Sequence, residues 1–180
     1  MTGNSMGTLF KITSFGESHG KVIGIIVEGV PAGINIDVNF IQEELNKRRP
    51  GTSEISTPRI EEDQLEILSG VFNNYSTGAP ICMIIKNRDI RSKDYDLLKD
   101  NPRPGHADLV ANFKYCGFND YRGGGRFSGR ITAGFVMAGA IAKLILVTKN
   151  IEINAFTTQI GEIKANISDL RNIKHFKNKN

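Results

Sequence analysis

The sequence has 180 residues, 39% of them hydrophobic, which is enough to form one domain with a buried core. Its formal net charge of +4 is too small by itself to indicate a nucleic-acid-binding protein, but it suits an anionic ligand. The two cysteines form no C-x-x-C pair, and the three histidines show no metal-ligand spacing. This composition is typical of a reduced, cytoplasmic protein without a metal site, and it disfavours a disulfide-stabilised secreted domain.

Targeting and membrane segments are not expected. Residues 1–8 lack the positive region and the following apolar stretch of a signal peptide. The longest apolar run, residues 131–142, is interrupted by Lys143 and is too short to span a bilayer. We therefore expect this run to be a buried helix and expect no membrane partner.

The first elements in chain order are two strands and a helix. Residues 9–14 and 22–30 are rich in Ile, Val and Phe, and the glycine-bounded segment 16–20 between them is predicted to be a turn. Asp37 is a predicted helix N-cap, and Val38, Ile41 and Leu45 then fall on one helix face. The sequence Pro50-Gly51 is expected to stop this helix.

The middle of the chain alternates short elements with turns. Residues 65–71 and 80–86 are predicted strands, separated by turn residues at Asn73-Asn74 and Gly78. Ser92 is expected to cap a short helix or turn that runs to Leu98. Prolines at positions 102 and 104 exclude regular structure there, and a short helix is predicted over 107–115.

The last elements follow a glycine-rich loop at 123–125. An apolar helix is predicted over 131–147, where the small residues Gly134, Ala138 and Ala142 would let another element approach closely. Residues 151–160 are predicted to form a strand. Residues 166–180 are rich in Asn and Lys and are expected to be a disordered tail behind a domain of residues 1–165. Strands mixed with two or three helices predict an α+β fold.

Two histidines are candidates for proton transfer. His19 lies in the segment GESHG, where glycines allow a sharp bend, and His106 follows the rigid segment Arg103-Pro104-Gly105. Histidine titrates near neutral pH, so two exposed histidines in rigid turns are reasonable general acids. A purely structural role in each turn is the alternative. Asp108 is expected to cap the next helix or, less simply, to orient the His106 imidazole.

Arginines point to an anion site. The chain has ten arginines, and nine of them lie between Arg48 and Arg130. Residues 121–130, YRGGGRFSGR, combine bare glycine amides with three arginines ahead of a predicted helix, which favours anion binding. The segment lacks the Gly-Lys-Ser/Thr of a P-loop, and a single RGG-like copy inside a folded pattern disfavours an RNA partner. From the residues alone, the chain is an enzyme or binder of a phosphorylated ligand.

Three segments together resemble the chorismate synthase family. The first is GESHG at 16–20, continuing as KVIGIIVEGVP. The second is RRPG at 48–51, followed by TPR at 57–59 and ILSGVF. The third is RSKDY at 91–95, then RPGHAD and DYRGGGRFSGR, ending in AGAIAK. Their order and spacing, from Met6 to about Gly161, make the resemblance specific.

The resemblance implies a fold and a chemistry. The fold is part of a β-α-β sandwich, with a homotetramer as the usual full-length assembly. The reaction is the anti 1,4-elimination of phosphate from 5-enolpyruvylshikimate 3-phosphate, which gives chorismate in the shikimate pathway of aromatic amino acid biosynthesis. This carbon–oxygen lyase uses reduced FMN, and NADPH would serve only as a reductant of the flavin.

The resemblance also implies residue roles. His19 would protonate the leaving phosphate, and His106 would protonate the reduced flavin. Substrate would be held by a set of polar and basic side chains, namely Ser18, Arg48, Arg59, Arg103 and Arg130. The segment Arg126, Phe127, Ser128 would bind FMN, although Phe127 stands where the family commonly has serine. Glu54 replaces a frequent arginine, which weakens any contact with a nicotinamide cofactor.

Length is the largest departure from the family pattern, because the chain ends at roughly half of a family member. The missing half carries further flavin contacts and an essential acidic residue. We therefore expect this chain alone to be inactive. The alternative is a truncated, non-catalytic FMN- or phosphate-binding fragment.

Overall fold

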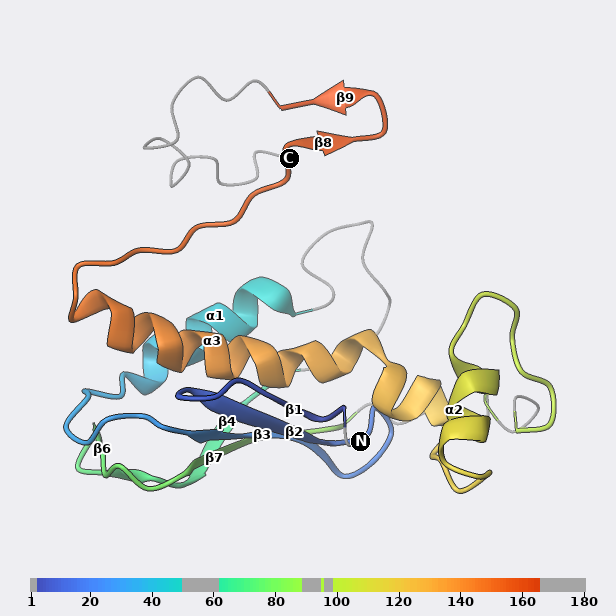
Figure 1. Cartoon of the computed structure of the whole chain (residues 1–180), viewed down its shortest axis with the longest axis horizontal. Coiled ribbons are helices and arrows are strands. Elements are labelled where there is room, and N and C mark those ends of the chain that lie inside the picture. Colours follow the sequence, from blue (N-terminus) through green and yellow to red (C-terminus); the bar gives the residue numbers. More distant parts are fainter. Residues whose placement is uncertain (1–2, 50–61, 89–94, 96–98, 166–180) are drawn as a thin grey trace. The chain divides into compact units, whose positions relative to one another are not determined.

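The computed structural model describes residues 3–49, 62–88, 95 and 99–165. The chain separates into two units, Met1–Ile145 and Leu146–Asn180. The first unit is built on a five-stranded antiparallel sheet in the order β1-β2-β3-β7-β4 (Figure 1). The strands are β1 Ser5–Met6, β2 Lys11–Gly16, β3 Val22–Glu28, β4 Leu65–Ser69 and β7 Ile81–Lys86. The mixed, antiparallel architecture confirms the predicted α+β class.

Strand β3 lies in the middle of the sheet because its side chains are apolar on both faces. Ile23, Ile25 and Val27 are fully buried toward the core. On the other face, the Phe15 ring of β2 lies over Gly24, where an added Cβ would come 2.2 Å from its Cζ atom. The predicted strands at 9–14, 22–30 and 80–86 are thus confirmed, with boundaries that differ by at most two residues.

A hairpin between β4 and β7 was not predicted. It pairs β5 Val71–Phe72 with β6 Tyr75–Ser76. Its turn residues Asn73 and Asn74 have φ values of 49° and 65°, the conformation of a two-residue hairpin turn that asparagine tolerates. The predicted Asn73-Asn74 turn is therefore right. The predicted strand 65–71 instead divides at Gly70, whose φ is 80°.

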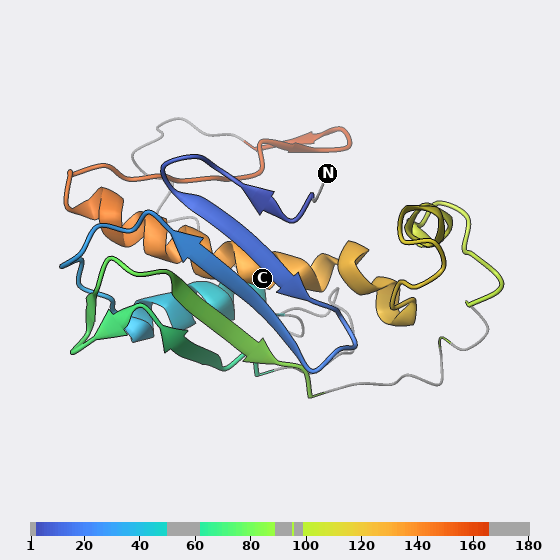
Figure 2. The same cartoon turned by 60° about the horizontal axis from the view of Figure 1, so that its bottom comes forward.

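Two helices, α1 Val38–Arg48 and α3 Thr132–Val147, cover one face of the sheet (Figure 2). Asp37 caps α1 as predicted, because its Oδ1 accepts hydrogen bonds from the Asn39 and Phe40 amides at 2.9 and 3.1 Å. Gly134 permits close packing of α3, since a Cβ there would lie 3.3 Å from the Gly24 carbonyl oxygen. The core between the layers contains Ile, Val, Leu and Met side chains, among them Ile25, Ile41, Leu45, Met83, Met137 and Ile141.

The apolar helix α3 agrees with its predicted range within one residue, and a 3-10 turn at Gly129–Ile131 extends it at its start. The helical segment Gly129–Val147 has 19 residues and is long and apolar enough, by length and composition alone, to cross a membrane. This corrects the expectation that the run is too short. Its inward residues Met137, Ala138 and Ile141 are buried in the core, so packing against the sheet accounts for its apolar character. The predicted buried helix is confirmed.

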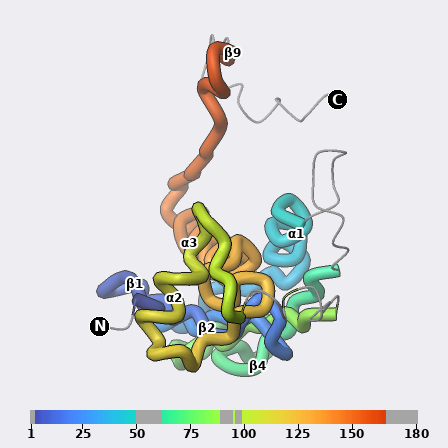
Figure 3. The backbone as a smooth tube through the Cα atoms, turned by 90° about the vertical axis from the view of Figure 1, so that its right-hand side faces the viewer, coloured from blue at the N-terminus to red at the C-terminus, as the bar shows by residue number. Residues whose placement is uncertain are grey.

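Short helical elements connect the sheet to α3. Helix α2 Asp108–Lys114 follows the irregular segment 102–105 and agrees with the predicted helix 107–115. The 3-10 helices η2 Arg122–Phe127 and η3 Gly129–Ile131 lead into α3. Figure 3 shows α2 beside this entry to α3. The predicted turn from Ser92 to Leu98 lies outside the described residues, apart from Tyr95.

The second unit contains a small hairpin of β8 Gln159–Ile160 and β9 Ile163–Lys164. The predicted strand over 151–160 is wrong, because residues 151–158 have no regular structure. Ile151 and Ile153 are exposed, and no described residue forms a sheet ladder with this segment. Apolar alternation alone does not make a strand without a partner. The predicted tail, 166–180, lies outside the described residues, and the boundary at 165 stays a prediction.

Candidate active site

The turn between β2 and β3 is packed against the glycine-rich loop. The Ser18 amide donates to the Gly125 carbonyl at 3.3 Å, and within the turn the Gly20 amide donates to Glu17 at 3.0 Å. Ser18 and His19 are only 1% and 6% exposed. The expectation of an exposed His19 is therefore wrong, because the loop around residues 123–125 closes over the turn.

The His19 ring has contacts on several sides. Its Nδ1 lies 3.3 Å from Ser18 Oγ, and its ring packs edge-on against Tyr95 with centroids 4.9 Å apart. Gly123 borders the ring so closely that an added Cβ would lie 2.2 Å from Nδ1. The first of the three consecutive glycines, Gly123, is thus explained by the space that the imidazole needs.

An ionised carboxylate lies near this histidine. Burial opposes ionisation of Asp120, but hydrogen bonds from Arg122 outweigh it, and the charge of His19 adds to them, so the pKa of Asp120 is lowered. Arg122 donates to both carboxylate oxygens, from Nε at 2.8 Å and Nη2 at 2.7 Å. Sequence reasoning missed Asp120, although it directly precedes the glycine-rich segment.

Arg126 fastens the glycine-rich loop to the sheet. Its Nη1 donates to the Gly16 carbonyl at 2.6 Å, and its Nη2 donates to the Ser14 carbonyl and hydroxyl at 3.1 and 2.6 Å. A further contact, 3.3 Å long, reaches Asn4 Oδ1. Arg126 therefore has a structural role in this chain, and its contact with FMN stays a prediction.

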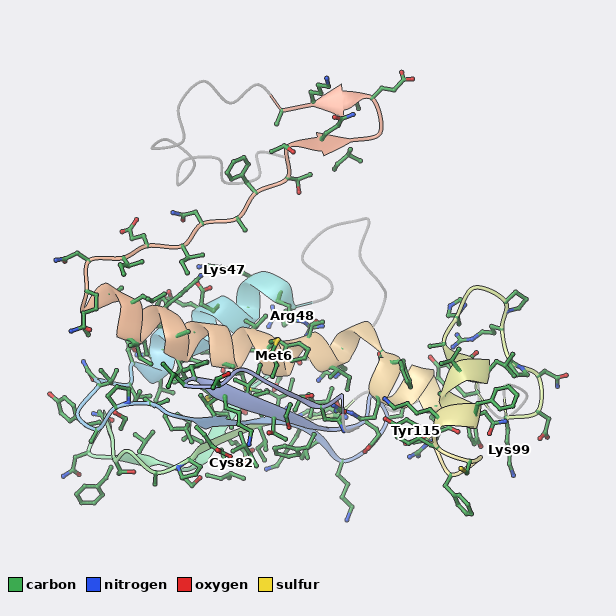
Figure 4. All side chains as sticks on the ribbon, in the orientation of Figure 1. Met6, Lys47, Arg48, Cys82, Lys99 and Tyr115 are labelled. Atoms are coloured by element: carbon green, nitrogen blue, oxygen red, sulfur yellow. The ribbon has the colours of Figure 1, made fainter. Side chains whose placement is uncertain are left out.

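Two arginines predicted to bind anions meet at one buried carboxylate. Asp63 Oδ2 accepts from Arg48 Nη1 at 3.0 Å, and Asp63 Oδ1 lies 2.7 Å from Arg130 Nη1. The Asp63 side chain is 0% exposed and that of Arg130 is 5% exposed, whereas Arg48, labelled at the end of α1 in Figure 4, is more accessible. The structure thus brings Arg48 and Arg130 together, as a shared anion site requires.

Asn87 joins this arginine cluster to the His19 turn. Its Oδ1 accepts from Arg130 Nε at 2.7 Å. Its Nδ2 donates to the Glu17 and Gly20 carbonyls at 3.0 and 2.8 Å. Sequence reasoning missed both Asp63 and Asn87, because each lies at a strand end with no motif of its own.

The second histidine lies in a different setting. His106 is exposed, and its Nδ1 lies 3.2 Å from the Pro104 carbonyl oxygen. Arg103 is held by Asp108, whose Oδ2 accepts from Arg103 Nε at 2.8 Å and whose Oδ1 accepts from Nη2 at 3.1 Å. The predicted cap at Asp108 is wrong: the N-cap of α2 is Ala107, and Asp108 pairs with Arg103 instead.

Two cavities adjoin the glycine-rich loop. One of about 50 Å³ is lined by Asp108, Asp120, Tyr121 and Gly124, among others, so it places the start of α2 beside the loop. The other, about 130 Å³, has a wall of aromatic and charged side chains, including Glu17, Tyr115, Phe118, Arg126 and Phe127.

The remaining residues predicted to bind cofactor or substrate are placed as follows. The Phe127 ring packs edge-on against Tyr115 with centroids 6.3 Å apart, and the Lys114 ammonium lies over both rings. Ser128 Oγ accepts from the Arg130 amide at 3.3 Å and caps η3. Arg59 lies outside the described residues. The loop arginines have partners within the chain, which does not favour an exposed RNA-binding patch.

Acidification should lower the free energy of unfolding through two carboxylates near this site. Hydrogen bonds from Arg103 lower the pKa of Asp108, and the pKa of Asp120 is lowered as described above. A depressed pKa in the folded state stabilises the protein above the unfolded value of about 4, and this stabilisation is lost as the pH falls through the folded pKa. Urea unfolding at pH 6 and pH 3 should show a smaller loss of stability on acidification for Asp120→Asn than for the wild type. Equal losses would contradict this assignment.

Comparison with known proteins identifies the family. Residues 10–180 match the family model described as chorismate synthase. The chain belongs to the chorismate synthase family. A chorismate synthase of Dehalococcoides mccartyi is 54% identical over 171 residues, which are 95% of this chain and 47% of that protein. That of Methanocaldococcus jannaschii is 53% identical over 176 residues, which are 97% of this chain and 46% of that protein.

A solved structure agrees with the family assignment. A chorismate synthase crystal structure superposes with a TM-score of 0.60 at 30% sequence identity, covering 88% of this chain and 40% of that one. The antiparallel α+β unit described above thus matches part of a chorismate synthase. The chain spans about half the length of the curated relatives that it matches.

Proposed function

We propose that this chain is the N-terminal half of an enzyme that eliminates phosphate from 5-enolpyruvylshikimate 3-phosphate to form chorismate. The observation that carries the proposal is the buried cluster of Arg48 and Arg130 on Asp63, joined through Asn87 to the turn that presents His19. An arginine pair beside a histidine suits a phosphate that leaves with a proton.

The chemistry places demands that these residues can meet. In the 1,4-elimination the C–O bond to phosphate breaks, a ring proton is lost, and a conjugated diene forms without net redox change. Negative charge grows on the departing phosphate, and the guanidinium groups of Arg48 and Arg130 would stabilise it. His19 would donate a proton to the phosphate, with Ser18 beside it as a further substrate contact. Arg59 and Arg103 would hold substrate anions.

Reduced FMN is the cofactor that the family implies, and it would supply electron density to the breaking C–O bond. The aromatic wall of Tyr115 and Phe127 suits a flat ring, and Arg126 and Ser128 are the family's positions for binding it. The adjoining cavity of about 130 Å³ is nevertheless smaller than the roughly 300 Å³ of a typical ligand pocket. We therefore propose that the described residues would supply only one side of a flavin site. His106 would serve the flavin as a proton donor, and NADPH would act only in reducing it.

The same family membership supports the setting of the enzyme. It would act in aromatic amino acid biosynthesis, in the cytoplasm, and as a homotetramer when full length. Its partner is the small phosphorylated substrate, and neither nucleic acid nor a membrane is required for the reaction.

Activity can be tested by supplying the missing half. The chain alone, with reduced FMN and no oxygen, should release no phosphate from the substrate. A chimera that joins residues 1–161 to the C-terminal half of the Methanocaldococcus jannaschii relative should release phosphate and form chorismate. In that chimera His106→Ala and His19→Ala should each lower kcat by at least about 100-fold, the scale of a lost general acid. The exposed α2 substitution Leu109→Ala is the control.

The outcomes separate two functions. An active chimera with wild-type turnover in both histidine variants would contradict the roles given to them. A folded chimera that binds FMN but forms no chorismate would favour the alternative of a non-catalytic FMN- or phosphate-binding fragment.

A further inference from the structure

Asp63 and Asn87 are polar and buried, and neither has been given a role of its own in the reaction. We propose that they are positioning residues of the anion site. Asp63 fixes the position of Arg48 relative to Arg130, and Asn87 fixes the position of Arg130 relative to the His19 turn. This inference rests on the proposed function only in taking phosphate as the anion that the arginines bind.

The place of Asp63 is fixed by its neighbours. Its backbone has a φ of 47°, which is uncommon for a residue other than glycine. Gln42 of α1 holds the chain on both sides, because its Nε2 donates to the Asp63 carbonyl at 3.1 Å and its Oε1 accepts from the Leu65 amide at 2.9 Å. The carboxylate is thereby presented between α1 and the start of α3, where it can reach one arginine with each oxygen.

The Asp63 carboxylate lies between two like charges. One of its oxygens pairs with Arg48 at 3.0 Å and the other pairs with Arg130 at 2.7 Å. A carboxylate between two guanidinium groups offsets their mutual repulsion. Asp63 thus allows the two arginines to lie together at one place.

Asn87 ties the anion site to the proton donor. Its single side chain accepts from Arg130 and donates to two carbonyls of the His19 turn, all within 3.0 Å. Movement of Arg130 would therefore be transmitted to the turn. The Asn87 amide thus holds the distance between the Arg130 guanidinium and the His19 imidazole. An aspartate in place of Asn87 could still accept the hydrogen bond from Arg130, but it could not donate the two hydrogen bonds to the turn.

The first test separates positioning from simple charge. Asp63→Asn removes a negative charge next to two arginines, so Coulomb attraction alone would make phosphate bind more tightly. Positioning predicts the opposite: affinity for inorganic phosphate, measured by calorimetry on this chain, should fall about 10- to 100-fold, the scale of a lost hydrogen bond to a charged group. Glu66→Gln is the control for charge, since it removes the same charge from a half-buried β4 residue that pairs with Lys86 and not with the two arginines. This variant should bind phosphate at least as well as the wild type.

A second variant tests Asn87 without relying on the first. In Asn87→Asp, hydrogen exchange of the Gly20 amide should accelerate about 10-fold or more, while exchange in the middle of β3 stays unchanged. Phosphate binding by Asp63→Asn equal to or tighter than that of Glu66→Gln would overturn the role of Asp63, and unchanged Gly20 exchange would overturn that of Asn87. A wild-type chain that binds phosphate but not the enolpyruvyl substrate would count against the proposed function alone.

Discussion

Gly125→Ala is expected to destabilise the chain by at least about 2 kcal/mol, because no other residue fits this backbone. Gly125 has φ 51° and ψ −119°, a region that glycine alone adopts readily. A Cβ there would lie 2.0 Å from the backbone carbonyl oxygen of Asp120, which cannot yield as a side chain would. Since Gly125 also accepts from the Ser18 amide, the loop and the His19 turn should be displaced together.

Urea unfolding followed by circular dichroism measures this effect. Gly129→Ala is the matched control in the same loop, because no atom lies within 4 Å of its added Cβ and its φ is not positive. We expect the control to change the free energy of unfolding by no more than about 0.5 kcal/mol. Similar losses in the two variants would show that the conformation of Gly125 is not what the loop depends on.

Arg126→Met should cost about 3 kcal/mol in the free energy of unfolding, because it removes the donors that serve the Gly16 and Ser14 carbonyls. Methionine keeps much of the length and apolar stem of arginine, so the loss reports on hydrogen bonds more than on packing. Arg126→Lys should recover less than half of it, since an ammonium cannot reproduce the planar fork.

The control for this experiment is Arg122→Met in the same loop. Arg122 pairs with Asp120 only two residues away, and its side chain is 36% exposed. A pair of this kind contributes no more than about 1 kcal/mol. If Arg122→Met lowered the free energy of unfolding as much as Arg126→Met, the conclusion that Arg126 holds the loop to the sheet would be wrong.

The elements that sequence predicts well here are those with local causes. Asp37 caps α1 through atoms only two and three residues away, and the apolar run of α3 needs only a neighbouring sheet. The β5–β6 hairpin was missed because its strands are two residues long, too short for a period to appear. The strand over 151–160 was wrongly predicted because pairing depends on a partner that local pattern does not reveal.

The residue types of the candidate site could be predicted from the sequence, but the contacts between those residues could not. Glycines around His19 and the arginine cluster mark an anion site, and the order of motifs indicates the family. That Asp108 would bind Arg103 rather than cap α2, or that Asp63 would receive two arginines, depends on contacts between distant segments. The burial of His19 has the same origin, because the loop that covers it lies more than 100 residues further along the chain, as the 110-residue separation of Gly16 and Arg126 shows.

That separation affects how the protein is made. The turn of residues 16–20 leaves the ribosome early, whereas its partner Arg126 is joined 110 residues later. At a synthesis rate of about 5–20 residues per second, the turn is synthesised about 5–20 s before the segment that packs against it. During this interval β2 and β3 can already form a local hairpin, but the histidine that the finished protein encloses is still open to solvent. The turn that presents His19 can therefore be enclosed only after the segment around Arg126 has been synthesised.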